Sequence, residues 1–440
     1  MRNARLFVLS ISFILLVAAC RAEEEGDGDG QAGGGGADTG SVSLFAAMEP
    51  FEAEALQAVL DELVNSETDY RAEVEASADF EEQAQIRVEG GNPPDVIMYP
   101  QPGAVVEQAE AGNAIALEDM GFDIADLEAT FGSYLLSLGE FEGKHYGIPT
   151  NINLKSTVWY AVDDFEAAGY QVPTTFDEMI ALSDQIVADG GTPWCVGFES
   201  GGATGWPATD WMEDIMLRTG GPDVYDQWVN HEIPFNDPAV AHAAELFGQV
   251  MFTEGYVLGG AEQTPSIAFG DAPLPMFEDP PGCLMHRQAN FIIAFFPEDA
   301  EAGTDYDSFP FPAIEQPGES ALFAGELSAV FRDAPEVRDF IERFVSQPVQ
   351  CAQGESQETS RISPNIEVGP ECYTNPLLAQ AAGVLTESLA ADTARFDASD
   401  LMPSAVGAGS FWTGMVEYMQ EGPDSLQGVL DDIEGSWPAS

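Results

Sequence analysis

Basic residues are scarce in this chain of 440 residues. Lysine and arginine number 14 against 76 aspartates and glutamates, the formal net charge is −62, and the only lysines are Lys144 and Lys155. Nucleic acid and anionic lipid headgroups are poor partners for such a field, so we expect no nucleic-acid partner. The acids are spread along the chain, which is typical of a solvated surface and resembles proteins from salty habitats. A neutral ligand suits this background, and a cationic one such as a polyamine is the alternative.

Sequence signatures of catalysis and of metal or cofactor binding are also missing. There is no GxSxG motif, and the nearest approach to a phosphate loop has Leu138 in place of its first glycine. The cysteines form no CxxC pair, so we expect no metal site and no cofactor. The histidines form no close ligand pair and are interpreted as structural: His145, His231, His242 and His286.

A surface adhesin and a glycoside hydrolase place different demands on a sequence. A surface adhesin would show repeats or an all-β pattern, and neither is visible. A glycoside hydrolase needs only two carboxylates about 5 to 9 Å apart, which composition cannot exclude in so acidic a chain. We expect no enzyme, with an extracellular glycoside hydrolase as the alternative.

Long apolar runs are absent after the first twenty residues. Arg2 and Arg5 precede an apolar run over 6–19, which ends in small residues before Cys20. This run is shorter than the about 20 residues that cross a bilayer, and its charged start and small-residue end are typical of a signal peptide. We predict a lipoprotein signal peptide with lipobox over 1–20 and a lipid anchor on Cys20. An ordinary secretory signal with an incidental cysteine is the alternative.

The chain after Cys20 divides into a tether and a folded body. Residues 21–40 are rich in glycine and acids and lack large apolar side chains, which predicts a flexible tether. The remaining residues exceed the size at which one hydrophobic core stops growing, so we expect two domains. We expect a lipid-anchored protein on the outer face of the cytoplasmic membrane or in the periplasm.

Four further cysteines remain, an even number in an exported chain, and they predict two disulfides. Three pairings are open. We favour Cys351 with Cys372 as a local clasp, and Cys195 with Cys283.

Strand and helix patterns alternate at the start of the folded body. Residues 41–46, 71–76 and 95–99 read as strands, and an apolar helical face runs from Phe51 to Leu63. Asp79 and Glu82 read as a capping box that opens a helix through Val88. This order predicts a mostly parallel sheet, whose ligands bind beyond the carboxyl ends of the strands.

Several segments resemble family 1 extracellular solute-binding proteins of ABC importers. The general motifs are residues 143–149, 158–160, 165–170 and 172–178. Further segments are similar to the alpha-glucoside-binding branch of that family: 192–195, 205–211, 282–288, 396–403 and 411–412. The likeness covers the chain after Gly40.

This resemblance implies an α/β fold with two lobes, the type II periplasmic-binding-protein fold, in which each lobe is a mostly parallel sheet flanked by helices. By analogy, three crossing segments near 149–156, 309–312 and 361–364 join the lobes, and the lobes close around a sugar held in the cleft. By analogy, lobe 1 comprises 41–150 plus 311–350, and lobe 2 comprises 151–310 plus 351–440. The implied protein is the monomeric substrate-binding component of an ABC sugar importer. Its partners are the importer's membrane subunits and a sugar, with an alpha-glucoside such as trehalose, sucrose or maltose favoured.

A sugar site needs flat aromatic surfaces for C–H faces and polar groups for hydroxyls. Trp206 and Trp412 are the expected stacking platforms, because glycines surround both. The expected polar contacts follow strand ends (Glu49, Asp79, Gln101), lie at the first crossing (Asn151, Asn153), belong to the branch motifs (Asp210, Arg287) or follow the second crossing (Glu326). For Arg287 a salt bridge is the alternative role, and Asp400 is interpreted as a cap of the following turn.

Overall fold

The computed structural model describes residues 40–77, 79–316 and 320–438. The predicted signal peptide, its lipidation site Cys20 and nearly all of the predicted tether lie outside these ranges. Within them, no helix is both long and apolar enough to cross a membrane.

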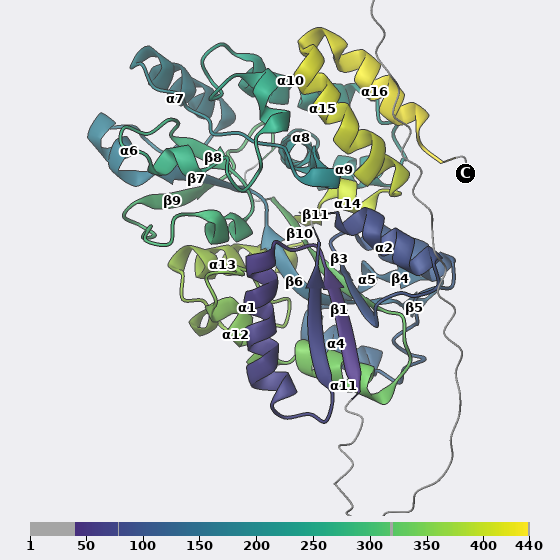
Figure 1. The fold of residues 1–440 in the computed structure, drawn as a ribbon. Helices are drawn as coiled ribbons and strands as arrows, with labels where there is room; N and C mark the ends of the chain where they lie inside the picture. Colours follow the sequence, from purple (N-terminus) through teal and green to yellow (C-terminus); the bar gives the residue numbers. More distant parts are fainter. Residues whose placement is uncertain (1–39, 78, 317–319, 439–440) are drawn as a thin grey trace, which may run out of the picture. The chain divides into compact units, whose positions relative to one another are not determined.

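A six-stranded sheet is the largest sheet of the described chain (Figure 1). Its strand order is β11-β10-β3-β1-β2, and β6 pairs with the other edge of β10. β1 runs parallel to β2 and β3, as the alternating pattern predicts, while β10 runs antiparallel to β3 and β6. The bounds are β1 Ser41–Ala46, β2 Arg71–Ala76, β3 Val96–Tyr99, β6 Gly147–Leu154, β10 Ala321–Val330 and β11 Ala394–Phe396.

A second sheet contains β7 (Thr157–Ala161), β8 (Met285–Arg287) and β9 (Tyr306–Pro310). All of its pairings are antiparallel, so the expectation of a mostly parallel sheet is wrong for this part of the chain. The physical reason is the path of the chain. It leaves the six-stranded sheet through β6 and β7 and returns through β9 to β10, so β7 and β9 run in opposite directions. A two-stranded hairpin, β4 (Glu140–Phe141) with β5 (Lys144–His145), completes the sheets.

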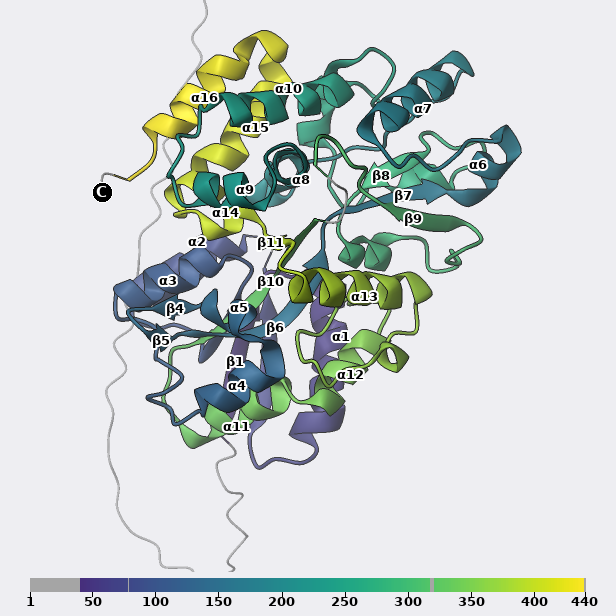
Figure 2. The same ribbon diagram turned by 180° about the vertical axis from the view of Figure 1, so that it is seen from behind.

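Sixteen α-helices are found in the described residues, and Figures 1 and 2 show α8, α10, α15 and α16 packed in one group. Their bounds are α1 Pro50–Leu60, α2 Phe80–Glu89, α3 Pro102–Glu110, α4 Ile124–Phe131, α5 Ser133–Ser137, α6 Val162–Ala168, α7 Phe176–Ala188, α8 Trp206–Gly220, α9 Pro222–Val229, α10 Pro238–Phe252, α11 Pro335–Phe344, α12 Gln347–Glu355, α13 Pro376–Ala390, α14 Ala398–Leu401, α15 Trp412–Glu421 and α16 Leu426–Gly435.

Separate apolar clusters underlie the two sheets. One contains Val42, Leu44 and Val96 from the six-stranded sheet with Phe340 and Phe344 of α11. Another is built on α8, α10, α15 and α16 and includes Val158 of the antiparallel sheet. α12 contacts α1, and α13 contacts β6 and β10. The predicted lobe boundaries stay a prediction, but these contacts favour grouping α12 and α13 with lobe 1.

Asp79 precedes α2, but the predicted capping box is wrong. The Asp79 side chain accepts no capping hydrogen bond, and its backbone has φ −101° and ψ 44°, outside the extended region that a cap needs. Its N–H donates to the Ser77 hydroxyl (3.1 Å), so it is not available to Glu82. At α1, by contrast, the Glu49 N–H donates to the Glu52 carboxylate at 3.0 Å.

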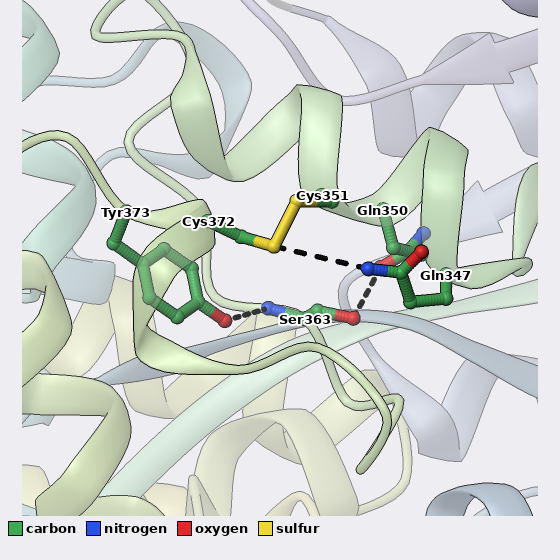
Figure 3. Close-up of a disulfide and its surroundings, with 6 residues drawn as sticks. All are labelled: Gln347, Gln350, Cys351, Ser363, Cys372 and Tyr373. Atoms are coloured by element: carbon green, nitrogen blue, oxygen red, sulfur yellow. Dashed lines mark hydrogen bonds between the residues drawn. A yellow bond between two sulfur atoms is a disulfide. The ribbon is translucent and has the colours of Figure 1, made fainter.

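Both disulfides follow the pairing that the sequence favoured. Cys195 is bonded to Cys283 across 88 residues, and Cys351 to Cys372 across 21. Figure 3 shows the second bond beside Ser363, whose N–H donates to the Tyr373 hydroxyl (3.1 Å) and whose hydroxyl donates to Gln350 (2.8 Å). The disulfide and these hydrogen bonds hold the irregular chain between α12 and α13.

Candidate ligand-binding site

A cavity of about 520 Å³ lies beyond the carboxyl ends of β1, β2 and β3. Glu49 follows β1, Ser77 follows β2 and Gln101 follows β3, and all three line it. Residues from other elements complete the wall, among them Trp206 at the start of α8 and Trp412 at the start of α15. The position is the one expected for a ligand of an open α/β sheet.

Aromatic side chains form one part of the wall. The Trp206 ring lies 5.2 Å from the Phe269 ring and 5.9 Å from that of Phe291, measured between centroids. Gly205 has φ +115°, and a Cβ there would lie 2.3 Å from the Trp412 carbonyl oxygen, so only glycine allows this approach. The glycine therefore brings the start of α8 against the start of α15, where the two tryptophans lie.

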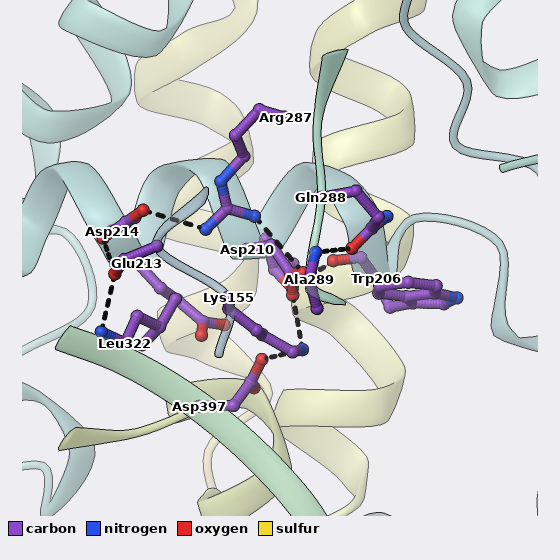
Figure 4. Close-up of polar contacts among 12 residues, drawn as sticks. Lys155, Trp206, Asp210, Glu213, Asp214, Arg287, Gln288, Ala289, Leu322 and Asp397 are labelled. Atoms are coloured by element: carbon purple, nitrogen blue, oxygen red, sulfur yellow. Dashed lines mark hydrogen bonds and ion pairs between the residues drawn. The ribbon is translucent and has the colours of Figure 1, made fainter. Parts of the chain in front are cut away.

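A buried lysine lines the cavity beside Trp206, with its ammonium nitrogen 5.2 Å from the centroid of the Trp206 ring (Figure 4). The Lys155 ammonium donates to Asp210 Oδ1 of α8 at 2.7 Å and to Asp397 Oδ2, just before α14, at 2.5 Å. Burial would lower the pKa of Lys155, but the two carboxylates outweigh burial and raise it. Lys155 is therefore charged, and it joins the segment after β6 to α8 and α14.

The network continues through two arginines. The Arg287 guanidinium contacts Asp210 at 3.3 Å and Asp214 at 3.1 Å, and Arg218 forms an ion pair with Asp214. All of these side chains are buried. Removing one partner from such a group leaves a buried charge uncompensated, so the loss of any single member is expected to destabilise the fold.

Two further buried acids have no cation partner among the described residues. Glu213 accepts the backbone N–H groups of Ala398 (3.0 Å) and Ser399 (3.1 Å). Burial, followed by neighbouring carboxylates, raises the pKa of Glu213 and of Asp400 well above the usual range. At Asp397 burial has the same effect, but Lys155 outweighs it and the pKa is lowered.

Three acids of this network offer oxygens within 4.8 Å of one another, a spacing compatible with a metal ion: Asp210, Glu213 and Asp397. The Lys155 ammonium already contacts two of them. A lysine ammonium supplies the positive charge that these carboxylates need, so we assign no metal site to them.

A second ion-pair group lines the cavity itself. Arg361 contacts Glu326 of β10 at 3.0 Å and Glu52 of α1 at 3.2 Å. All three side chains are buried, and all three residues line the cavity. They add charged hydrogen-bonding groups to the cavity wall.

Sequence comparison identifies the family. The model of the bacterial extracellular solute-binding proteins matches residues 50–350, more than half of the chain. The chain belongs to the bacterial extracellular solute-binding proteins.

Two curated relatives extend along most of this solute-binding protein. It is 43% identical over 355 residues to the osmoprotective compounds-binding protein GgtB of Synechocystis, covering 80% of this chain and 82% of the relative. It is 41% identical over 370 residues to the alpha-glucosides-binding periplasmic protein AglE of Rhizobium meliloti, covering 82% and 79%. These values confirm the resemblance to the alpha-glucoside-binding branch.

Solved structures confirm the type II two-lobe fold of this solute-binding protein. The solute receptor AcbH superposes with a TM-score of 0.76 at 17% identity, covering 90% of this chain and 98% of its own. RafE in complex with raffinose gives 0.72 at 19% identity, covering 90% and 98%.

The predicted site residues of this solute-binding protein divide into two groups. Six of them line the cavity: Glu49, Gln101, Asn153, Trp206, Glu326 and Trp412. Gln101 donates to Glu81 at 3.2 Å, and Asn153 accepts from Asn290 at 3.0 Å.

The other four are not among the lining residues. Asp79, the residue before α2, is exposed. Asn151 is buried in β6. Asp210 and Arg287 belong to the ion-pair network around Lys155. The alternative role of Arg287, a salt bridge, is the one observed, since it contacts Asp210 and Asp214.

Among the lining residues that were missing from the predicted list are Lys155, Arg361 and Asp400. A signal for Lys155 was available, because a lysine is rare in this chain and this one lies within the first predicted crossing, 149–156. Arg361 begins the third predicted crossing. The interpretation of Asp400 as a cap of the following turn is wrong, because Ser404 is the residue at the start of the next helical segment. Asp400 lies inside α14, whose N-cap Asp397 accepts the Asp400 N–H at 3.0 Å.

Proposed function

We propose that this chain is the extracytoplasmic substrate-binding component of an ABC importer and that its cavity binds a neutral sugar. An alpha-glucoside such as trehalose, sucrose or maltose is the favoured ligand. The observation that carries the proposal is one cavity of about 520 Å³ that combines Trp206 and Trp412 with buried hydrogen-bonding groups. Ligand cavities of about 300 to 1,000 Å³ with this composition suit a ring that has an apolar face and a rim of hydroxyls.

The electrostatics of the wall support a neutral ligand. Lys155 and Arg361, the two bases that line the cavity, are each bonded to two acids of the protein. An anionic ligand would therefore find no free cation there. The relatives' names agree with this choice, since AglE is named for alpha-glucosides and GgtB for osmoprotective compounds.

A cationic ligand such as a polyamine is the second candidate. Seven acids line the cavity against the two bases: Glu49, Glu52, Glu81, Glu199, Asp271, Glu326 and Asp400. A polyamine could pair with them, but it would leave the aromatic wall without an apolar partner.

The proposal includes the anchor and the movement. The lipid anchor is Cys20, and the lobes close on the sugar because the closed form alone makes contacts with it from both sides. Lobe 1 then comprises 41–150 and 311–350, with α12 and α13 as its proposed extension. Lobe 2 supplies Trp206 and Trp412.

Calorimetric titration tests the proposal. The purified protein is titrated with trehalose, sucrose, maltose, a β-linked disaccharide, glucose and spermidine, at low and high salt. We expect one-to-one binding of an alpha-glucoside without turnover. If the protein binds spermidine and none of the sugars, the ligand is a polyamine and not a sugar. Release of glucose over time would indicate a hydrolase.

Two tryptophan variants locate the site. Trp206→Ala and Trp412→Ala are each expected to weaken sugar binding about ten-fold or more, because each loses a stacking surface. Trp437→Ala is the matched control, since Trp437 stacks on His231 at 4.0 Å away from the cavity. Unchanged affinity in both cavity variants would contradict the proposed site.

A further inference from the structure

Asp400 is a cavity-lining acid whose carboxyl group has no partner among the described residues. Only 6% of the residue is exposed. Its backbone N–H donates to Asp397 Oδ1 at 3.0 Å, which fixes the main chain at the first turn of α14. Among residues 40–77, 79–316 and 320–438, no donor or cation within bonding distance of the Asp400 carboxyl is found.

The nearby cations are already engaged by other acids. Lys155 contacts Asp210 and Asp397, while Arg287 and Arg218 contact the acids of α8. An ionised carboxylate that is buried without a cation or a donor is strongly disfavoured against its neutral form. Asp400 is therefore expected to keep its proton near neutral pH.

The groups that face Asp400 come from several elements. Asp397 precedes α14, Asp210 and Glu213 project from α8, Glu81 projects from α2, and Lys155 follows β6. From α9, which also packs against α14, Tyr225 directs its hydroxyl to the Phe396 carbonyl at 3.0 Å. From α3, Glu107 accepts from Ser404 at 2.9 Å. Burial and the surrounding acids raise the pKa of Asp400, and Lys155 only partly opposes them.

We propose that Asp400 binds the ligand directly, as a neutral carboxyl group whose O–H donates a hydrogen bond to an oxygen of the sugar. This inference rests on the proposed function and assigns one binding residue and its protonation state. Ser399 and Trp412 line the cavity beside it, and the Trp412 indole donates to the Ser399 hydroxyl at 3.2 Å. A sugar ring against Trp412 thus meets a stacking surface and an O–H donor carried by one segment of chain.

The neutral carboxyl implies a particular dependence on pH. Raising the pH through the elevated pKa of Asp400 removes the donated proton and places a negative charge against ligand oxygens. Sugar affinity is therefore expected to fall as the pH rises, whereas a carboxylate that accepted from sugar hydroxyls would give the opposite trend.

Calorimetric titration between about pH 6 and about pH 9.5, with the sugar selected above, tests this inference. Asp400→Ala is expected to weaken binding about ten-fold or more, because an unpaired ligand oxygen replaces a buried hydrogen bond. Asp400→Asn has an amide that still donates a hydrogen bond, so it is expected to weaken sugar binding less than Asp400→Ala does. It is also expected to abolish the decrease in sugar affinity at alkaline pH. Asp299→Asn removes an exposed acid away from the cavity and is the control that keeps the wild-type profile.

Two results would overturn the inference while leaving the proposed function intact. One is an Asp400→Ala protein, shown to be folded by its thermal transition, that binds as tightly as the wild type. The other is a decrease in sugar affinity at alkaline pH that is still present in the Asp400→Asn variant. If the wild type binds no sugar at any pH, the proposed function fails and the inference falls with it.

Infrared spectroscopy of the ligand-free protein tests the protonation state separately. The wild-type minus Asp400→Asn difference spectrum at neutral pH is expected to contain the carbonyl band of a protonated carboxyl group. A carboxylate band in its place would overturn the neutral form, whatever the ligand proves to be.

Discussion

Replacing Lys155 with methionine is expected to lower the stability of the protein strongly. Lys155→Met keeps most of the side-chain volume but removes the ammonium that contacts Asp210 and Asp397. Both acids are buried, and Asp397 is left without a cation among the described residues. Breaking a buried ion pair by removing one partner costs about 3 to 5 kcal/mol. We expect a loss in this range near pH 7.

Urea unfolding monitored by tryptophan fluorescence measures the effect, since the free energy of unfolding extrapolates linearly with denaturant. The deficit is expected to shrink at acid pH. Without Lys155 the folded-state pKa values of Asp210 and Asp397 rise, so the native variant binds protons more readily than its unfolded chain. Adding Asp210→Asn to the variant should recover part of the loss.

Lys144 is the matched control, because it is the only other lysine of the chain. Its ammonium contacts Asp119 at 2.7 Å on the exposed surface, where an ion pair contributes little. Lys144→Met should therefore change the urea midpoint only slightly. Equal effects of the two substitutions, or a loss below about 1 kcal/mol for Lys155→Met, would refute the role given to the buried lysine.

Two further predictions concern stability. Replacing Cys195 and Cys283 with alanine should lower the free energy of unfolding by about 4 to 5 kcal/mol, and replacing Cys351 and Cys372 by about 3 kcal/mol, because the first bond closes a loop of 88 residues and the second one of 21. Urea unfolding of both variants checks this order, and the reverse order would contradict the chain-entropy reasoning. Burial lowers the pKa of His286 to about 4, so the folded protein holds it neutral while the unfolded chain binds a proton. Stability should therefore fall as the pH drops from about 6.5 toward about 4, by up to about 3 kcal/mol from this group, and His286→Gln should lessen the fall; an unchanged pH profile would argue against the buried neutral ring.

The beginning of the fold was predictable from the sequence because its strands alternate. Residues 41–46 and 71–76 form strands with the expected bounds, and 96–99 differs from the expected strand by one residue. The alternation of apolar and polar residues indicates which side chains face a core, but it does not indicate whether a neighbouring strand runs parallel or antiparallel. The antiparallel pairing of β7 with β8 and β9 depends on contacts between residues far apart in the chain, which local patterns do not contain.

The site was predicted in part for a similar reason. Glu49 and Gln101 line the cavity, as the rule about strand ends led us to expect, because that rule is geometric and holds for β1 and β3. Asp210 was misplaced because nearly every residue of α8 is buried, so no periodicity tells which face meets the cavity. Asp400 was interpreted as a cap because an acid before a turn is a local signal, and only tertiary packing shows that it lies inside α14 and lines the cavity.

A crystal structure with the sugar selected by calorimetry tests the central claim most directly. The account predicts one sugar in the cavity, with a ring against Trp206 or Trp412 and a sugar oxygen within hydrogen-bonding distance of Asp400. A sugar bound outside this cavity, or a sugar in the cavity that touches neither tryptophan, would contradict it.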